Sequence, residues 1–276
     1  MFGLDDIILN ALSEDIGTGD ITSLSTIPAD KKAHGRFIAK EDGIICGTDV
    51  VERTFKLIDD DTVIKFFVKD GDSVKKGDVL CEVSGKAISL LTAERVSLNF
   101  LQHLSGIATR TNQAVEQIKG YNAKIADTRK TTPGLRVLEK RAVKVGGGVN
   151  HRFNLADGVL IKDNHIVAAG GIKNAVEAAR KNAPHTLKIE VEVENFEMLN
   201  EALEAGADII MLDNMSNEDM AKAVMLINGR AITEASGNMG EKSLKEVAQT
   251  GVDLISIGAV THSVKALDIS LKFKMI

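Results

Sequence analysis

The second half of the chain alternates short apolar runs with segments of helical periodicity, and this alternation constrains the fold more than any other feature. Residues 195–206 and 216–228 repeat apolar side chains at spacings of three and four, which is typical of amphipathic helices. Strands that alternate with helices form a parallel sheet or barrel, because each helix carries the chain back to begin the next strand. The six runs predicted to be strands are 123–130, 158–165, 187–194, 207–214, 231–238 and 252–259.

The strand ends recur at a regular period. Polar residues at five successive ends are separated by 30, 21, 21 and 22 positions; they are Lys162, Glu192, Asp213, Glu234 and Ser256. This spacing leaves room for one strand, one helix and short loops. A standard α/β barrel has eight strands, so six predict an incomplete or smaller barrel. The alternative is a doubly wound sheet. Such a sheet is expected to carry a G-x-G-x-x-G loop after its first strand, and that motif is absent there.

The first half of the chain has a different texture. Residues 4–13 form a predicted helix, and two glycines in 14–23 end it. From about 34 to 90 the alternation predicts mostly β-structure. Thr92 is the predicted N-cap of a long helix that reaches about Lys119, and the domain boundary is expected near this helix.

Residues 70–80, DGDSVKKGDVL, resemble the hairpin of biotinyl and lipoyl carrier domains, which place a modified lysine at a tight turn. The lysine that follows, Lys86, lacks the usual neighbouring methionine. We therefore interpret this stretch as a structural hairpin.

Composition excludes several classes of function. The formal net charge of −5 argues against non-specific nucleic-acid binding, and one Tyr without any Trp leaves little for base stacking. No apolar run approaches the roughly 18–20 residues that span a bilayer, so no membrane partner is expected. The N-terminus lacks the basic region of a signal peptide, and the two cysteines have no metal-like spacing. These features predict a reduced, cytoplasmic setting.

The predicted strand ends divide by charge. Early ends supply cations, Arg129, Lys130 and Lys162, and a glycine-rich turn adds His151 and Arg152. Later ends supply carboxylates and then two Ser/Gly groups: Glu190, Glu192, Glu194, Asp213, Glu234, Ser236-Gly237 and Ser256–Gly258. Arginine binds carboxylates and phosphates bidentately, carboxylates beside phosphates hold Mg²⁺, and glycine turns bind phosphate through backbone N–H groups. The pattern predicts a polyphosphate with its metal next to a second anionic substrate.

Three glutamates, Glu190, Glu192 and Glu194, alternate with valine and share one strand face. Like charges on one face repel unless they are paired. We therefore expect some of them to bond to Lys130 or Lys162 rather than to metal. His103 and His185 are interpreted as structural or surface residues.

Long stretches of the chain resemble the quinolinate phosphoribosyltransferases, also called nicotinate-nucleotide diphosphorylases (carboxylating). The most specific are ADTRKTTPGLR at 126–136 and EKRAVKVGGGVNHRFNLADGVLIKDNHI at 139–166, and others follow in order to residue 273. The resemblance implies an N-terminal open α/β sandwich over residues 1–104, with about 266–276 packing back on it, and an incomplete barrel over 105–265. It also implies a homodimer, or a hexamer, with active sites at the subunit interface.

The activity that the resemblance implies joins quinolinate to 5-phosphoribosyl 1-diphosphate with loss of CO₂, in NAD biosynthesis. Arg129, Arg152 and Lys162 would hold the two quinolinate carboxylates, with His151 beside them. Arg95 would enter the neighbouring subunit's site. Other roles carried over by motif are Thr128 and Lys130 on the diphosphate side, Glu192 and Asp213 for ribose and Mg²⁺, and Ser236, Gly237, Asn238, Ser256 and Gly258 around the 5′-phosphate. Of these, Lys130, Lys162, Glu192 and Asp213 are the predicted catalytic residues.

One motif departs from the family. EASGN-M at 234–239 often reads EASGG-I in relatives, but Asn238 keeps a backbone N–H and tolerates unusual dihedrals. Two other functions stay open. One is a phosphoribosyltransferase-fold protein of molybdenum-transport operons, against which the retained Arg129, Arg152 and Lys162 argue. The other is a non-enzymatic binding module built around residues 70–80.

Overall fold

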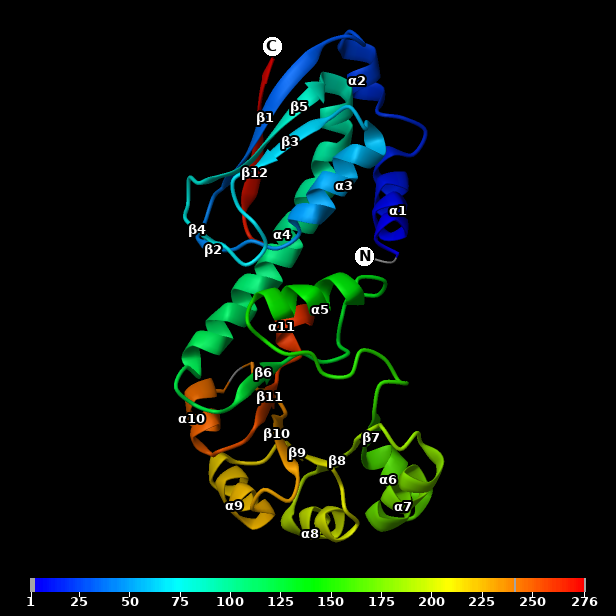
Figure 1. The fold of residues 1–276 in the computed structure, drawn as a ribbon, viewed down its shortest axis with the longest axis vertical. Helices are drawn as coiled ribbons and strands as arrows, with labels where there is room; N and C mark the ends of the chain where they lie inside the picture. Colours follow the sequence, from blue (N-terminus) through cyan, green and yellow to red (C-terminus); the bar gives the residue numbers. More distant parts are fainter. Residues whose placement is uncertain (1–2, 241, 276) are drawn as a thin grey trace. The chain divides into compact units, whose positions relative to one another are not determined.

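The computed structural model describes residues 3–240 and 242–275, and contacts within the chain group it into two compact units (Figure 1). Unit 1 comprises the chain up to Asn112, then Thr132–Gly147, and the chain from Val264 onward. Unit 2 comprises Gln113–Thr131 and Gly148–Ser263. These units differ from the limits expected at 104 and 265 mainly because residues 132–147 group with the N-terminal unit.

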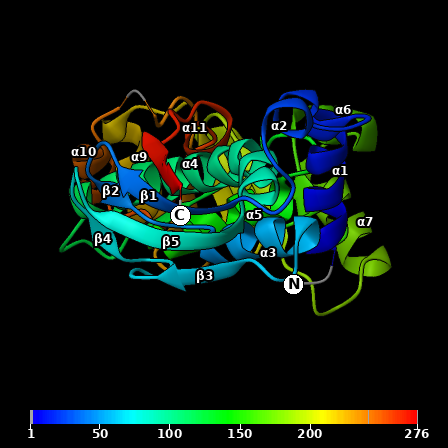
Figure 2. The ribbon, with the colours of Figure 1, turned by 90° about the horizontal axis from the view of Figure 1, so that it is seen from above.

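Unit 1 is built on a four-stranded antiparallel sheet in the order β12-β1-β5-β3. Its strands are β1 (Lys32–Ala39), β3 (Val63–Phe66), β5 (Val79–Lys86) and β12 (Ile269–Met275), and a two-stranded ribbon joins β2 (Gly43–Ile44) to β4 (Ser73–Val74). Figure 2 shows β5 between β1 and β3. Its helices are α1 (Leu4–Ile16), α2 (Ile21–Thr26), α3 (Thr48–Ile58), α5 (Arg136–Val145) and most of α4 (Ala87–Gln117).

The core of unit 1 lies between this sheet and helices α3 and α4. Phe37 of β1 meets Phe55 of α3 edge to face, with ring centroids 6.0 Å apart. Leu80 of β5 and Leu101 of α4 are buried in the same cluster. One covered sheet face is the arrangement of an open α/β sandwich, so the predicted class of the first domain is confirmed.

Three local expectations for this unit are wrong. Residues 48–58 form helix α3 rather than β-structure, because Val50, Val51, Thr54 and Phe55 are buried at helical spacing. Helix α4 begins at Ala87, so Thr92 lies inside it, where its hydroxyl bonds back to the Ile88 carbonyl instead of capping. The hairpin expected at 70–80 does not form, because β4 pairs with β2 while β5 pairs with β1 and β3.

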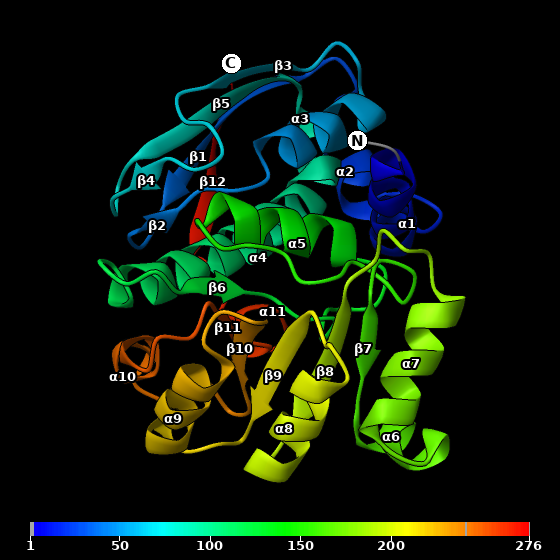
Figure 3. The ribbon, with the colours of Figure 1, turned by 60° about the horizontal axis from the view of Figure 1, so that its bottom comes forward.

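Unit 2 is a six-stranded parallel sheet in the order β6-β11-β10-β9-β8-β7 (Figure 3). Its strands are β6 (Lys124–Ala126), β7 (Val159–Ile161), β8 (Ile189–Val193), β9 (Ile209–Asp213), β10 (Ile232–Ser236) and β11 (Leu254–Ser256). All six were predicted from the sequence. Among the described residues, β6 and β7 do not pair, so the sheet is open where a closed barrel would join its ends.

Helices follow the strands through short connections. They are α6 (Asp163–Ala169), α7 (Ile172–Asn182), α8 (Phe196–Glu204), α9 (Asn217–Ile227), α10 (Leu244–Gln249) and α11 (Ala259–His262). Asn195 accepts a hydrogen bond from Met198 N, and Ser216 accepts one from Asp219 N. These caps start α8 and α9 within a few residues of the preceding strands, which accounts for the period of about 21 residues.

Strand alternation decides which side chains face the cavities of unit 2. In β8, Ile189, Val191 and Val193 are buried on one face, and Glu190 and Glu192 point to the other. Because all six strands run parallel, their carboxyl ends meet at one edge, where the predicted polar residues come together. In the part of the chain that the structure describes, no helix has both the length and the apolarity that a membrane crossing requires.

Candidate active site

Two cavities lie at the carboxyl ends of the strands of unit 2. The first, about 320 Å³, is the cationic cavity, lined by Thr128, Arg129, Lys130, His151, Arg152, Leu160, Lys162, Met211, Glu234, Ser236 and Ser256. The second, about 490 Å³, is the glycine cavity; beyond residues that it shares with the first, it is lined by Glu192, Asp213, Asn214, Gly237, Asn238, Met239, Gly240, Gly258, Ala259, His262 and Ser263. Every residue to which the sequence analysis assigned a binding or catalytic role lines one or both cavities, except Arg95.

Arg95 lies in unit 1, exposed on α4. Since the helix begins at Ala87, Arg95 sits in its third turn. A helix capped by Thr92, as expected from the sequence, would have put Arg95 in its first turn, where the helix dipole favours an anion; that placement is wrong.

The glycine-rich turn is held in place by a buried aspartate. Asp127, which follows β6, is fully buried. Its Oδ2 accepts a hydrogen bond from Asn150 Nδ2 at 2.6 Å, and its Oδ1 accepts one from His151 N at 2.8 Å. Val149 N also donates to the Ile125 carbonyl. These bonds fix the backbone at His151, so the glycines before it do not leave the turn free.

Arg152 carries its charge in an unfavourable setting. Its Nη1 donates to the Gly158 carbonyl at 2.9 Å, while its Nε is buried without a hydrogen-bond partner among the described residues. Burial, and then the charge of Arg129, lower the pKa of Arg152, and only Glu190 acts in the opposite direction. An anion bound between these two guanidinium groups would relieve both costs.

The neighbouring lysine has a carboxylate partner. Lys162 Nζ lies 2.6 Å from Glu192 Oε2, which confirms the expected pairing of one strand glutamate with lysine. The backbone N of Lys162 donates to His165 Nδ1, a bond that orients the first turn of α6. Glu194, by contrast, is exposed beyond the end of β8. The three alternating glutamates thus occupy three different environments.

The glycine cavity is shaped by unusual backbone. Gly237 and Asn238 have φ of 92° and 50°, both in the left-handed region. A Cβ at Gly237 would overlap the Asn214 side chain, so only glycine fits there. Asparagine is among the few other residues that adopt this conformation readily, which explains how Asn238 can replace glycine.

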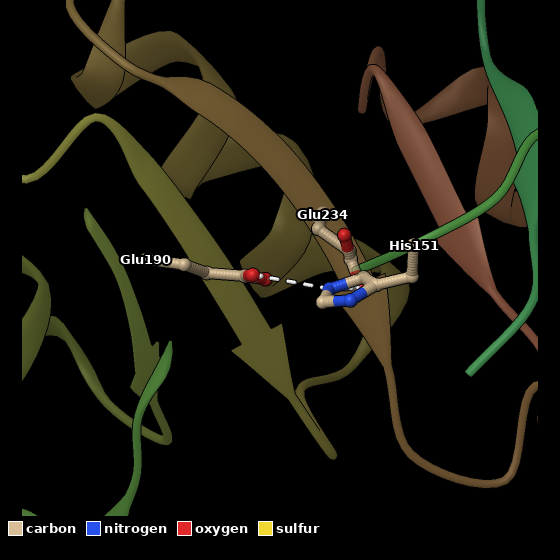
Figure 4. Close-up of side chains that lie close together, drawn as sticks. All are labelled: His151, Glu190 and Glu234. Atoms are coloured by element: carbon tan, nitrogen blue, oxygen red, sulfur yellow. Dashed lines mark ion pairs between the residues drawn. The ribbon is translucent and has the colours of Figure 1, made fainter. Parts of the chain in front are cut away.

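A buried cluster beneath the cationic cavity joins His151 to two glutamates (Figure 4). His151 Nε2 lies 3.0 Å from Glu190 Oε2 and 3.7 Å from Glu234 Oε1. The exposed fractions of Glu190 and Glu234 are 4% and 0%. Both glutamates were visible at strand positions in the sequence, but their convergence on His151 was not predicted.

These three side chains have ligand atoms close enough for a metal ion, yet their hydrogen bonds disfavour one. His151 Nδ1 accepts a bond from Arg152 N, so the neutral ring carries its proton on Nε2. A histidine that binds metal through Nε2 normally donates from Nδ1 instead. The N–H group at His151 Nε2 therefore faces the carboxyl groups of Glu190 and Glu234 instead of a metal ion.

Comparison with known proteins agrees with the cavity chemistry. The family model described as "Quinolinate phosphoribosyl transferase, N-terminal domain" matches residues 20–105, and that of the C-terminal domain matches residues 107–272. The chain belongs to the quinolinate phosphoribosyltransferase family.

Relatives within the quinolinate phosphoribosyltransferase family match over most of their length. A probable nicotinate-nucleotide pyrophosphorylase [carboxylating] of Bacillus subtilis is 49% identical, over 94% of this chain and 89% of its own. A chloroplastic member from Arabidopsis thaliana is 47% identical, over 98% of this chain and 83% of its own. The solved structure of NadC from Streptococcus pyogenes superposes with a TM-score of 0.94 at 45% identity, over 100% of this chain and 98% of that one.

Family membership makes this chain a phosphoribosyltransferase. It therefore rules against the binding module that residues 70–80 left open. Those residues form part of the small ribbon and sheet of unit 1.

Proposed function

We propose that this site converts quinolinate and 5-phosphoribosyl 1-diphosphate to nicotinate mononucleotide, CO₂ and diphosphate, a step of NAD biosynthesis. The observation that carries the proposal is that two cavities of different chemistry adjoin and share lining residues. The cationic cavity suits a small dianion, and it shares Thr128, Lys130, Lys162, Ser236 and Ser256 with the glycine cavity, which suits phosphates. A nucleophile bound in one lies next to an electrophile bound in the other.

Quinolinate is placed by cations in this proposal. Arg129, Arg152 and Lys162 bind its two carboxylates, with His151 at their side. The buried Nε of Arg152 supports this placement, because a carboxylate would supply the partner it lacks. Lys162 would exchange part of its bond to Glu192 for the substrate.

The ribosyl donor occupies the glycine cavity. Ser236, Gly237, Asn238, Ser256 and Gly258 surround its 5′-phosphate with backbone N–H groups and hydroxyls, and Lys130 and Thr128 contact the diphosphate. This assignment is supported by the left-handed backbone at 237 and 238, since both residues line the glycine cavity and such turns can present N–H groups to an anion.

A divalent cation fits the same cavity. Glu192 and Asp213 end two neighbouring strands and line the glycine cavity, and carboxylate oxygens are the donors that Mg²⁺ prefers. When bound, Mg²⁺ would neutralise the charge of the departing diphosphate. Glu192 can offer its second oxygen while Oε2 stays near Lys162.

The chemistry needs no covalent intermediate with the enzyme. Departure of diphosphate develops positive charge at C1 of the ribose, and the ring nitrogen of quinolinate attacks C1. Lys130 stabilises the negative charge of the departing diphosphate. The new positive charge on the ring nitrogen then stabilises the carbanion that loss of CO₂ creates beside it.

The proposal extends to assembly and location. A homodimer with shared sites would supply Arg95 from the partner, since Arg95 is exposed and lies outside the described cavities. A cytoplasmic location is supported by two buried cysteines, Cys46 and Cys81, that remain as free thiols.

Substrate choice tests the cationic cavity. Nicotinate, with one carboxylate, should be used at least about 100-fold less efficiently than quinolinate, because a cavity built for two carboxylates leaves a buried guanidinium unpaired. The measurement is kcat/KM for each acid with 5-phosphoribosyl 1-diphosphate, by formation of nicotinate mononucleotide. Comparable values would contradict the assignment. No product from quinolinate would favour the molybdenum-operon relative.

Metal dependence tests the acidic strand ends. Activity should disappear in excess EDTA and return with Mg²⁺ or Mn²⁺. Asp213→Asn should raise the KM for the ribosyl donor about tenfold or more and leave the KM for quinolinate within about threefold, because Asp213 lines only the glycine cavity. Full activity in EDTA would refute the metal role.

A further inference from the structure

Loss of CO₂ creates a requirement for a proton donor. The bond between C2 and its carboxylate breaks, and its electron pair stays on C2 of the pyridine ring. C2 must then receive a proton before nicotinate mononucleotide can leave. A group that supplies it must be an acid near neutral pH, must reach the quinolinate cavity and must be recharged after each turnover.

The buried cluster stands between two cavities. Glu234 and His151 line the cationic cavity at the carboxyl ends of the strands. They also line a third cavity, of about 560 Å³, which we call the rear cavity. Its wall includes Val159, Ile209 and Leu254, the first residues of β7, β9 and β11. A proton can therefore enter the cluster from one side and leave it from the other.

The hydrogen bonds distinguish the two glutamates. His151 Nε2 lies 3.0 Å from Glu190 Oε2, so this oxygen has a partner, while Glu190 Oε1 is buried without one among the described residues. Both oxygens of Glu234 are buried without a well-formed hydrogen bond among the described residues, because the nearby Ser256 hydroxyl donates to the Ala235 carbonyl at 3.3 Å. A carboxylic acid tolerates such a setting far better than a carboxylate does.

Electrostatics point the same way. Burial, and then the negative charge of Glu190, raise the pKa of Glu234 from 4.5 to about 7, against smaller opposing effects of His151, Ser256 and Lys162. Glu234 is thus protonated in a substantial fraction of molecules at neutral pH.

We propose that Glu234 is the acid that protonates C2 after decarboxylation. Its O–H bond breaks as the C2–H bond forms, and the resulting carboxylate takes a new proton from water through the rear cavity. Glu190 and His151 act as positioning residues, because His151 Nε2 contacts both glutamates and holds the cluster together next to the cationic cavity. The inference rests on the proposed function, because C2 of quinolinate is the proton acceptor.

The test separates ribosyl transfer from decarboxylation. With Glu234→Gln, release of diphosphate in the first turnover should stay within about threefold of wild type. Release of CO₂ should fall about 100-fold, and the carboxylated mononucleotide should accumulate, because an unprotonated C2 recombines with CO₂. Rapid quench with ¹⁴C-labelled quinolinate measures both. Glu234→Asp retains an acid and should recover at least about tenfold of the loss.

The pH profile gives a second readout. Glu234 acts in its protonated form, so wild-type CO₂ release should decline as pH rises through about 7. Glu234→Gln should lack this decline. Asp253→Asn is the matched control. Asp253 directly precedes β11, accepts hydrogen bonds from Thr233 of β10, and lines neither the cationic nor the rear cavity. This variant should keep both the wild-type rate of CO₂ release and its decline with pH.

Thermal unfolding checks the protonation state without activity. A raised pKa in the folded protein means that wild type loses stability, relative to Glu234→Gln, as pH rises from about 4.5 to 7. The inference is overturned if Glu234→Gln releases CO₂ at the wild-type rate, or slows diphosphate and CO₂ equally. It is also overturned if the stability difference does not change with pH, since the pKa of Glu234 would then not be raised in the folded protein. Wild type that releases neither product overturns the proposed function as well.

Discussion

Replacement of Arg152 by methionine should lower kcat/KM for quinolinate by about 30- to 4000-fold. Removal of one partner from a buried charge pair costs about 2–5 kcal/mol, and each 1.4 kcal/mol is a factor of ten. Arg152 is held by Gly158 O and flanked by Arg129, so its charge stands ready for an anion before substrate arrives. Steady-state kinetics with quinolinate varied at saturating ribosyl donor measure the effect.

The control for this prediction is Arg180→Met. Arg180 is exposed on α7 of the same unit, paired with Asp208 at 3.0 Å and distant from both carboxyl-end cavities. Its loss should leave kcat/KM within about twofold of wild type. Arg152→Lys should recover only part of the activity, because an ammonium cannot form the bidentate bond of a guanidinium. The assignment of Arg152 fails if Arg152→Met keeps kcat/KM within threefold.

Mixtures of two inactive variants should regain activity if the site is shared between subunits. Arg95→Ala and Lys162→Ala each remove one residue from every site of a homodimer. In a mixed dimer, one site has both residues intact and the other has neither. Random pairing at equal amounts makes half the dimers mixed, so activity should rise to about a quarter of wild type.

This restoration is large because each variant alone should be almost inactive. The measurement is product formation after co-refolding, with mixed dimers confirmed by differently tagged chains. Mixed dimers that form and stay inactive would show that Arg95 does not complete a partner's site. Wild-type activity in Arg95→Ala alone would assign that residue a local role on α4.

The second half of this sequence reveals its architecture through local patterns. Alternation in β8 and helical spacing in α8 and α9 depend only on near neighbours in the chain, so six strands and their order along the chain were predictable. The same patterns place Lys162, Glu192, Asp213 and Ser256 at strand ends. Since parallel strands end at one edge, their gathering around two cavities also followed.

Predictions from local sequence patterns were wrong where contacts with distant residues decide the secondary structure. Residues 48–58 contain valine and threonine, which favour strands, yet their burial against β1 and β5 makes them helix α3. The start of α4 was misplaced because Thr92 resembles a cap, while the contacts that begin the helix at Ala87 come from the sheet of unit 1.

The sequence by itself determined the family, the fold class and most of the charged residues that line the two carboxyl-end cavities, because these depend on motif and period. Tertiary structure alone decided which charges neutralise one another. Lys162 takes Glu192 at 2.6 Å, and His151 turns its Nε2 toward Glu190 and Glu234 because Asp127 fixes the turn before it. Residues 39 to 83 positions apart form that cluster, and only strand register and loop closure bring such positions together.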